Sequence, residues 1–293
     1  MTMKELQKCL SASFFVLLFC GCSIQKIAVR QTAELMRDAA PAFEEESDLI
    51  LAEQAMAANL KVLEGLLRID PLNKDLSLLL SQGFGGYAFS FLELSAPVRA
   101  KDFYMRGLNF AMNYLVSESD SLKQFRTHGP LSQFETALKD FDEDDVPLLF
   151  WAGYNWGNFI NLSKDNPVIV SDMGRAEALM KRVIELDETY YYGGAHLFLG
   201  VFYGSRSAML GGNLEKAKQH FEKALHISDK KLLIASYMYA RFYAVQTQDE
   251  RLFNRLLRYV TRAPAHILQE QNLANQVAKV RARRALRRKN EFF

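Results

Sequence analysis

NLEKAKQHFEKALHISD, residues 213–229, forms one amphipathic segment and contains the pattern that decides the fold. Asn213 is a favourable N-cap residue, and Ala217, Phe221 and Ala224 then fall on one face of the expected helix. Two small residues seven positions apart, with a bulky one between them, let a neighbouring helix approach closely and take one large side chain into its groove. This order is typical of the second helix of a tetratricopeptide-type hairpin.

The same spacing occurs four more times, which indicates an internal repeat. Its other occurrences are Asn59, Leu63 and Leu66; Ala100, Tyr104 and Gly107; Ala176, Met180 and Val183; and Leu252, Leu256 and Tyr259. Successive equivalent positions are 41, 76, 41 and 35 residues apart, where the regular repeat has about 34. The units therefore carry insertions, and the longest gap holds a connection at 117–147.

Aromatic helical stretches precede several of these second helices and supply their partners. They lie at 148–162, 195–203 and 235–245. Because no segment shows the β-branched alternation of a strand, the predicted fold is all-α. We expect four to five stacked helical hairpins of tetratricopeptide-repeat type, forming a short superhelix with a concave inner surface. Residues 265–290 are expected to be a C-terminal capping helix whose polar outer face ends the stack.

The N-terminus predicts export. Two lysines precede an apolar run at 10–19, which is about half of the roughly 20 residues needed to span a bilayer and is typical of a signal peptide. The sequence FCGC, 19–22, resembles the bacterial lipobox, in which a cysteine after a small residue is acylated and becomes the first residue of the mature chain. Cys22 follows Gly21 and is the predicted lipidation site. The alternative is an ordinary secretory signal with an incidental thiol.

Three segments follow from cleavage before Cys22. We expect a lipoprotein signal peptide at 1–21, a lipid-anchored tether at 22–30 and a helical-repeat domain at 31–293. The protein would then be periplasmic and attached to a membrane by its lipid. An exported chain without disulfides needs a sufficient core, and 49% hydrophobic residues supply one.

The formal net charge of +2 conceals a basic C-terminus. Residues 279–293 hold seven Lys and Arg side chains against one acidic residue, Glu291. Such a tail could bind anionic lipid or nucleic acid, but an exported protein should not meet nucleic acid. The alternative is that these charges form the solvated face of the closing helix.

No catalytic or metal-binding motif is present. None of the five histidines stands in HExxH, and the mature chain would have no free cysteine for a thiolate site. The glycines of QGFGGYAF, 82–89, lack the lysine and hydroxyl of a phosphate loop, and Ser205 lacks the G-x-S-x-G context. The sequence predicts a non-catalytic protein without cofactor or metal.

A binding role has more support. The segment WAGYNWGNFIN, 151–161, holds both tryptophans of the chain among tyrosine, phenylalanine and asparagine. An apolar wall with a few polar groups is what small-molecule sites use. Trp151 and Trp156 point some 140° apart on a helix, so we expect one to enter the core. The alternative is aromatic packing between hairpins. The candidate ligand- or partner-binding residues are Trp151, Tyr154, Trp156, Asn158, Tyr191, His196 and Tyr203.

Three segments, 193–228, 247–257 and 272–293, resemble the T component of tripartite ATP-independent periplasmic (TRAP) transporters, the TatT-type lipoproteins. The resemblance covers most of the mature chain. It implies a lipid-anchored periplasmic accessory protein that docks the transporter's solute-binding protein and binds or hands over its apolar or amphipathic solute. The alternative is a repeat lipoprotein that scaffolds envelope protein assembly. Because repeat proteins often self-associate through terminal surfaces, a homo-oligomer stays open.

Overall fold

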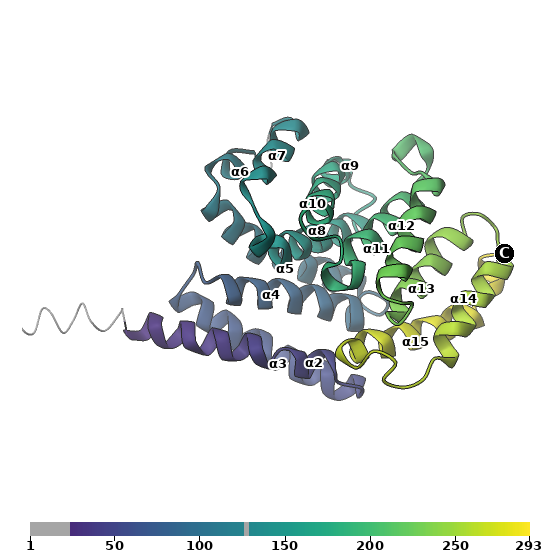
Figure 1. Cartoon of the computed structure of the whole chain (residues 1–293), viewed down its shortest axis with the longest axis horizontal. Helices are drawn as coiled ribbons and strands as arrows, with labels where there is room; N and C mark the ends of the chain where they lie inside the picture. The colour runs from purple at the N-terminus through teal and green to yellow at the C-terminus, as the bar shows by residue number, and fades with distance from the viewer. Residues whose placement is uncertain (1–23, 126–128) are drawn as a thin grey trace, which may run out of the picture.

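The computed structural model describes residues 24–125 and 129–293, and these ranges contain helices and no β-strand (Figure 1). The predicted all-α fold is therefore confirmed. After a helical segment at 24–39, the longer helices are α3 (Leu49–Ile69), α4 (Lys74–Tyr87), α5 (Pro97–Glu118), α8 (Val146–Asn161), α10 (Met173–Asp187), α11 (Tyr190–Gly204), α12 (Leu214–Ile227), α14 (Glu250–Arg262) and α15 (Asn272–Arg287). The shorter ones are α2 (Pro41–Glu44), α6 (Asp120–Phe125), α7 (Leu131–Ala137), α9 (Pro167–Ser171) and α13 (Leu233–Tyr239). Single turns are η1 (Ala88–Leu92), η2 (Leu138–Asp140), η3 (Glu143–Asp145), η4 (Ala208–Leu210), η5 (Ala240–Ala244), η6 (Gln269–Gln271) and η7 (Lys289–Glu291).

Helices close in sequence pack in pairs, and the pairs stack. The pairs are α4 with α5, α8 with α10, α11 with α12, and α13 with α14, and contacts of α5 with α8, α10 with α11 and α12 with α13 join them. The second helices predicted from the repeat spacing lie in α5, α10, α12 and α14, whereas the triplet that begins at Asn59 lies in α3, which packs on α4. Stacked helical pairs are thus present, and their tetratricopeptide character stays an interpretation.

The small–large–small pattern of α12 explains how close two helices come. Ala217 and Ala224 are buried, and Phe221 between them is fully buried against Gly200 of α11. A Cβ at Gly200 would lie 2.8 Å from Phe221 Cδ1, so only glycine admits the ring here without a shift. Asn213 caps α12 by accepting a hydrogen bond from the Lys216 amide at 2.9 Å.

A polar side chain fills the corresponding gap between α4, α5 and α8. Asn155 of α8 is fully buried and donates from Nδ2 to the carbonyl oxygens of Ser81, at 3.0 Å, and Trp151, at 2.8 Å. Gly85 and Gly107 face it, and a Cβ on either would lie 2.5–2.7 Å from the amide. The glycine in the triplet of α5 therefore makes room for an asparagine of the next helix pair.

Helix α15 closes the superhelix and does more than end the stack. It packs on α13 and α14, as a capping helix would, and also on α2 and α3 near the other end of the chain (Figure 1). Arg281 of α15 is 6% exposed and forms an ion pair with Glu93, which follows η1. Lys279 donates to the carbonyl oxygen of Ala263 at 2.9 Å. Two of the seven basic side chains are thus buried and structural, while most of the others remain exposed.

The predicted signal peptide and the lipidation site Cys22 lie outside the described residues, so both stay predictions. Residues 24–30, expected in the tether, are already helical, and Val29 is buried against the N-terminal helices. None of the helices in the described ranges combines the length and apolarity needed to cross a membrane.

Candidate ligand-binding cavity

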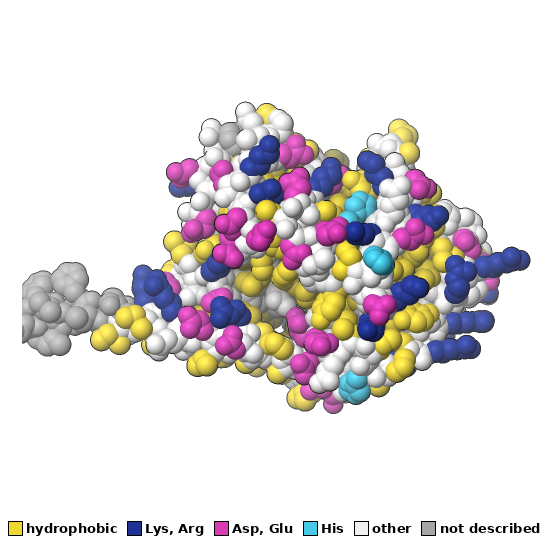
Figure 2. Space-filling model, viewed as in Figure 1, with side chains coloured by type: hydrophobic (Ala, Val, Ile, Leu, Met, Phe, Trp, Pro, Cys, Tyr) yellow, Lys and Arg dark blue, Asp and Glu magenta, His cyan; other side chains and the backbone are white. Residues whose placement is uncertain are grey.

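A cavity lies between the N-terminal and C-terminal helices of the superhelix. Its volume is about 210 Å³, compared with about 150 Å³ for a protein cavity that holds benzene. Its walls come from α2, α3, α4, η1, α8, α11, α13, η6 and the start of α15. Figure 2 shows hydrophobic side chains gathered across the centre of the face between α4 and α11. No single helix pair could enclose this space, because its lining spans residues 40–274.

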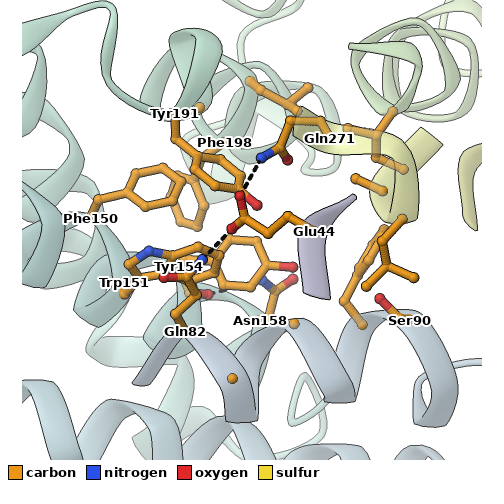
Figure 3. A pocket seen from close by; sticks show the side chains of 18 of the residues that line it. Glu44, Gln82, Ser90, Phe150, Trp151, Tyr154, Asn158, Tyr191, Phe198 and Gln271 are labelled. Atoms are coloured by element: carbon orange, nitrogen blue, oxygen red, sulfur yellow. Dashed lines mark hydrogen bonds between the residues drawn. The ribbon is translucent and has the colours of Figure 1, made fainter. Parts of the chain in front are cut away.

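One wall of the cavity is aromatic. Phe150, Trp151 and Tyr154 come from α8, and Tyr191 comes from α11 (Figure 3). The distance between ring centroids is 5.1 Å for Trp151 and Tyr154, 5.2 Å for Trp151 and Tyr191, and 5.6 Å for Phe150 and Tyr191. The two Trp151 contacts are edge-to-face and the Phe150–Tyr191 contact is tilted, and ring contacts of this kind fix ring positions, so the wall is largely preformed.

Tyr191 reaches the cavity because the backbone is left-handed at the start of α11. Its φ is 49°, and the next two residues, Tyr192 and Gly193, have φ of 58° and 77°. This conformation costs a non-glycine residue about 1–2 kcal/mol. The turn brings the Tyr191 ring against Phe150 and Trp151, so aromatic burial offsets the local strain.

A polar cluster lies close to the aromatic rings. Glu44, the last residue of α2, accepts hydrogen bonds from Gln82 Nε2 of α4 and from Gln271 Nε2 of η6, the latter at 2.8 Å (Figure 3). Burial raises the pKa of the Glu44 carboxyl to about 7, although the two hydrogen bonds favour its ionised form. The cluster also connects segments 227 residues apart in the chain.

A second charged side chain, Arg206, lies in another part of the lining. Its guanidinium carbon is 3.7 Å from the centroid of the Phe202 ring, and Nη1 donates to the Phe202 carbonyl oxygen at 2.8 Å. Burial lowers the pKa of Arg206 to about 10. Asn158 and Asn161 also line the cavity, and Asn161 Oδ1 is buried without a hydrogen-bond donor among the described residues.

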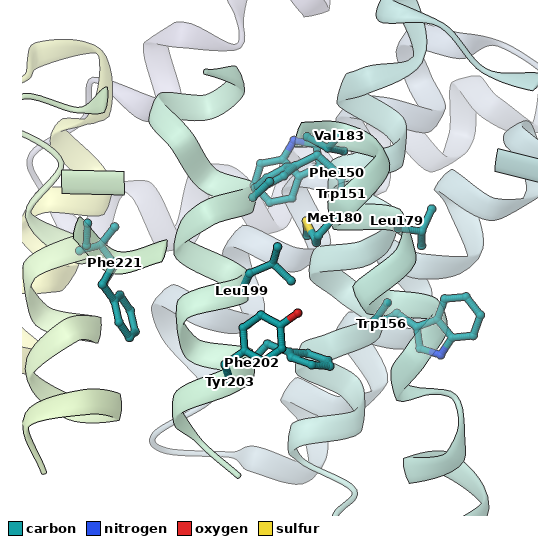
Figure 4. Packing of buried hydrophobic residues seen from close by; sticks show 14 of the residues in the cluster. Phe150, Trp151, Trp156, Leu179, Met180, Val183, Leu199, Phe202, Tyr203 and Phe221 are labelled. Atoms are coloured by element: carbon teal, nitrogen blue, oxygen red, sulfur yellow. The ribbon is translucent and has the colours of Figure 1, made fainter. Parts of the chain in front are cut away.

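Four of the seven candidate residues predicted from the sequence lie together in this lining. They are Trp151, Tyr154, Asn158 and Tyr191. Trp156 does not line it, because it points to the other side of α8 and packs edge-to-face on Phe134 of α7, with 6.1 Å between ring centroids (Figure 4). Both tryptophans are buried, one at the cavity and one in the core.

His196 and Tyr203 also lie outside the lining of the cavity. Both belong to α11, and they contact side chains of α10 and α12. His196 Nδ1 is 2.9 Å from His220 Nδ1, and Tyr203 donates to Glu177 at 2.6 Å and stacks on the His220 ring. Burial lowers the pKa of His196 and lowers that of His220 to about 4. Both residues have hydrogen-bonding partners within the protein and neither lines the cavity. Their contact with a ligand therefore stays a prediction.

The polar cluster was not predicted from the sequence. Glu44 is the first of three successive glutamates, and nothing in the order of residues separates it from Glu45 and Glu46. Gln82 and Gln271 are ordinary helical residues in sequence terms. Only the contact between α2 and η6 shows which carboxylate faces the cavity.

The arrangement of the described residues is suited to binding. Nowhere in the described ranges do three His, Cys, Asp or Glu side chains gather as they would around a metal ion. The cavity offers an apolar volume, an aromatic wall and a few fixed polar groups, which is the composition of a small-molecule site.

These features define the protein as a stack of paired helices that contains a ligand-sized, aromatic-walled cavity. The chain belongs to the TRAP transporter T-component family, whose sequence model matches residues 45–293. It is also 24% identical over 242 residues to an uncharacterized protein of Treponema pallidum (strain Nichols), a match that covers 73% of this chain and 75% of that protein. The family identifies the chain as an accessory component of a TRAP transport system and confirms the resemblance seen in the sequence.

Proposed function

We propose that this protein is a lipid-anchored periplasmic accessory that docks the solute-binding protein of its TRAP system and receives an apolar or amphipathic solute in the aromatic cavity. The observation that carries the solute role is the cavity itself, about 210 Å³ in volume and bounded by Phe150, Trp151, Tyr154 and Tyr191. A preformed apolar space loses little conformational freedom when a ligand enters, which favours binding.

The mutation Gly86→Leu tests the solute role. Gly86 of α4 lines the cavity, and a Cβ there would meet only Met56 Cε, at 3.8 Å, so a larger side chain enters the cavity without a backbone clash. The matched control is Gly65→Leu, at an exposed position of α3. A Cβ at Gly65 would have open space around it, with no contact within 4 Å beyond its own helix backbone and chain neighbours. We expect calorimetry with 1-octanol to show binding to the wild type and to the control and at least about tenfold weaker binding to Gly86→Leu. Equal binding to all three proteins would remove the cavity from the proposal.

Docking is tested separately in cells. Crosslinking of the tagged, full-length protein, followed by mass spectrometry, should capture one dominant periplasmic solute-binding protein. A set of envelope-assembly proteins without a solute-binding protein would instead support the alternative scaffold role.

Membrane attachment depends on Cys22. Cys22→Ser should release the protein from the membrane pellet as a soluble form, because acylation would then have no thiol. Continued pelleting of this variant would contradict lipid anchoring, and Cys20→Ser provides the matched control because that cysteine lies before the expected cleavage site.

A further inference from the structure

When it is ionised, Glu44 has a negative charge that no described side chain compensates. Its two carboxylate oxygens accept hydrogen bonds from the neutral amides of Gln82 and Gln271, and it forms no ion pair with a described Lys, Arg or His. The other charged residue of the lining, Arg206, stacks on Phe202 and is not paired with Glu44. Amide donors fix the position of the carboxylate but leave its charge uncompensated.

A carboxylate in this position is costly unless something neutralises it. Moving a charge from water into an apolar site carries a penalty of several kcal/mol that hydrogen bonds only partly offset. A purely apolar ligand would bind better if an uncharged side chain stood at position 44. The cavity therefore has an unmet electrostatic requirement, which either a proton or a cationic ligand can satisfy.

The aromatic wall favours the cationic ligand. Cations bind over the faces of Trp, Tyr and Phe rings within about 6 Å of the centroid, and aromatic cages recognise ammonium groups in this way. Trp151, Tyr154, Tyr191 and Phe150 lie together on the side of the cavity that Glu44 approaches, as Figure 3 shows. The aromatic rings and the carboxylate thus border the same volume.

We propose that the cavity binds an amphipathic cation, with an ammonium head between Glu44 and the aromatic rings and an apolar body along the aliphatic lining. That lining includes Leu60, Leu63, Leu79, Leu197, Val201 and Met238. This inference rests on the proposed solute role and adds the chemical class of the ligand. The carboxylate supplies the counter-charge, the amides of Gln82 and Gln271 hold it in place, and the rings replace part of the hydration of the head.

Three probes of equal chain length test this inference on the full-length protein. Octyltrimethylammonium, 1-octanol and octanoate share the apolar body and differ in head charge, and calorimetry gives the dissociation constant of each. We expect the ammonium probe to bind at least about tenfold more tightly than octanol, and octanoate to bind most weakly. Glu44→Gln should remove the preference for the ammonium probe, and octanol should bind this variant at least as tightly as it binds the wild type. Glu135→Gln, at an exposed position of α7 outside the lining, is the matched control.

The outcomes separate the inference from the function on which it rests. Equal binding of octanol and the ammonium probe, or tightest binding of octanoate through Arg206, would overturn the cationic class and leave the apolar cavity intact. Binding of no probe to the wild type would overturn both. Octanol binding that Gly86→Leu weakens, together with an ammonium preference that Glu44→Gln removes, would support both.

A measurement on the wild type covers the case in which Glu44→Gln folds poorly. Because the probe has a permanent charge, the ammonium preference should be strong at about pH 8.5 and lost at about pH 5.5, on either side of the Glu44 pKa of about 7. The titratable groups on which the Glu44 charge acts are Tyr190, Tyr191 and Tyr192 of α11. Glu45 adjoins Glu44 in the chain, Glu270 of η6 acts on Tyr192, and His266 contacts Asn272, which donates to the Glu45 carbonyl oxygen. The tyrosines stay neutral across this range because burial raises the pKa of each of them. A preference that does not change with pH would contradict the role of Glu44.

Discussion

Arg281 and Glu93 form a largely buried ion pair, 2.8 Å between Nη2 and Oε2, that joins α15 to the end of η1. The side chains are 6% and 19% exposed, and the same guanidinium stacks on Phe89, 3.8 Å from the ring centroid. Burial lowers the pKa of Arg281, but the neighbouring charges, Glu93 first among them, together raise it above its ordinary value. The pair therefore holds the last helix of the chain against its N-terminal third.

Removal of the Glu93 charge should destabilise the protein strongly. Glu93→Gln leaves a buried guanidinium without its counter-charge, a change that typically costs about 3 kcal/mol or more of the free energy of unfolding. Urea denaturation measures this cost. The matched control is Glu250→Gln, which breaks an exposed pair with Lys289 and should cost far less, because solvent screens that pair. Similar costs for the two variants would mean that the Arg281 pair contributes no more than a surface pair.

Gly200→Ala should lower the free energy of unfolding because the added Cβ would lie 2.8 Å from the fully buried ring of Phe221. Overpacking costs about 1–3 kcal/mol, whereas alanine gains up to about 1 kcal/mol over glycine within a helix. Gly65→Ala is the control, because a Cβ at Gly65 would have open space around it. This variant should raise the free energy of unfolding by about 0.5–1 kcal/mol. An equal gain in both variants, measured by urea denaturation, would show that Phe221 can move aside.

The His196–His220 contact should make the protein less stable as the solution becomes acidic. Burial, and then the neighbouring His196, lower the pKa of His220 to about 4, while burial lowers that of His196 despite the nearby Glu188. The unfolded chain therefore binds more protons than the folded one below the ordinary histidine pKa of about 6.5. Stability is present above that pH and is lost as the pH falls from about 6.5 towards 4.

Thermal unfolding from about pH 8 to about pH 4.5 measures this loss. The charged groups around the pair are Glu177, Glu188, Lys181, Lys216 and Lys223. His220→Gln should flatten the decline, whereas the exposed His226→Gln, on the same helix, should retain it. An unchanged decline in His220→Gln would assign the acid sensitivity to other groups.

Glu44 should have the opposite pH dependence. Because burial raises its pKa from 4.5 to about 7, the folded state holds this proton more tightly than the unfolded state. Its contribution to stability is therefore full at low pH and is lost as the pH rises through about 7. The difference in melting temperature between Glu44→Gln and wild type should shift in favour of the variant between about pH 5 and about pH 8. A difference that stays constant across this range, as expected for the exposed control Glu135→Gln, would contradict the raised pKa.

Local patterns in the sequence were sufficient to predict much of the fold. The spacing of Ala217, Phe221 and Ala224 predicted the helix and its close neighbour, because a helical face repeats every 3.6 residues whatever lies around it. The structure shows the consequence as the contact between Phe221 and Gly200. The connection at 117–147 was less predictable, since short helices such as α6 and α7 depend on packing against longer ones.

The sequence by itself determined the all-α class, the position of most long helices and four residues of the cavity lining, because helix propensity and amphipathic periodicity are local properties. Tertiary structure alone decided which aromatic face was enclosed, why Trp156 faces Phe134 and Trp151 faces the cavity, and how α15 returns to the N-terminal helices. It also selected Glu44 from three successive glutamates, because the contact with Gln271 spans 227 residues. Contacts of that range depend on the accumulated geometry of every intervening helix pair, which no local pattern encodes.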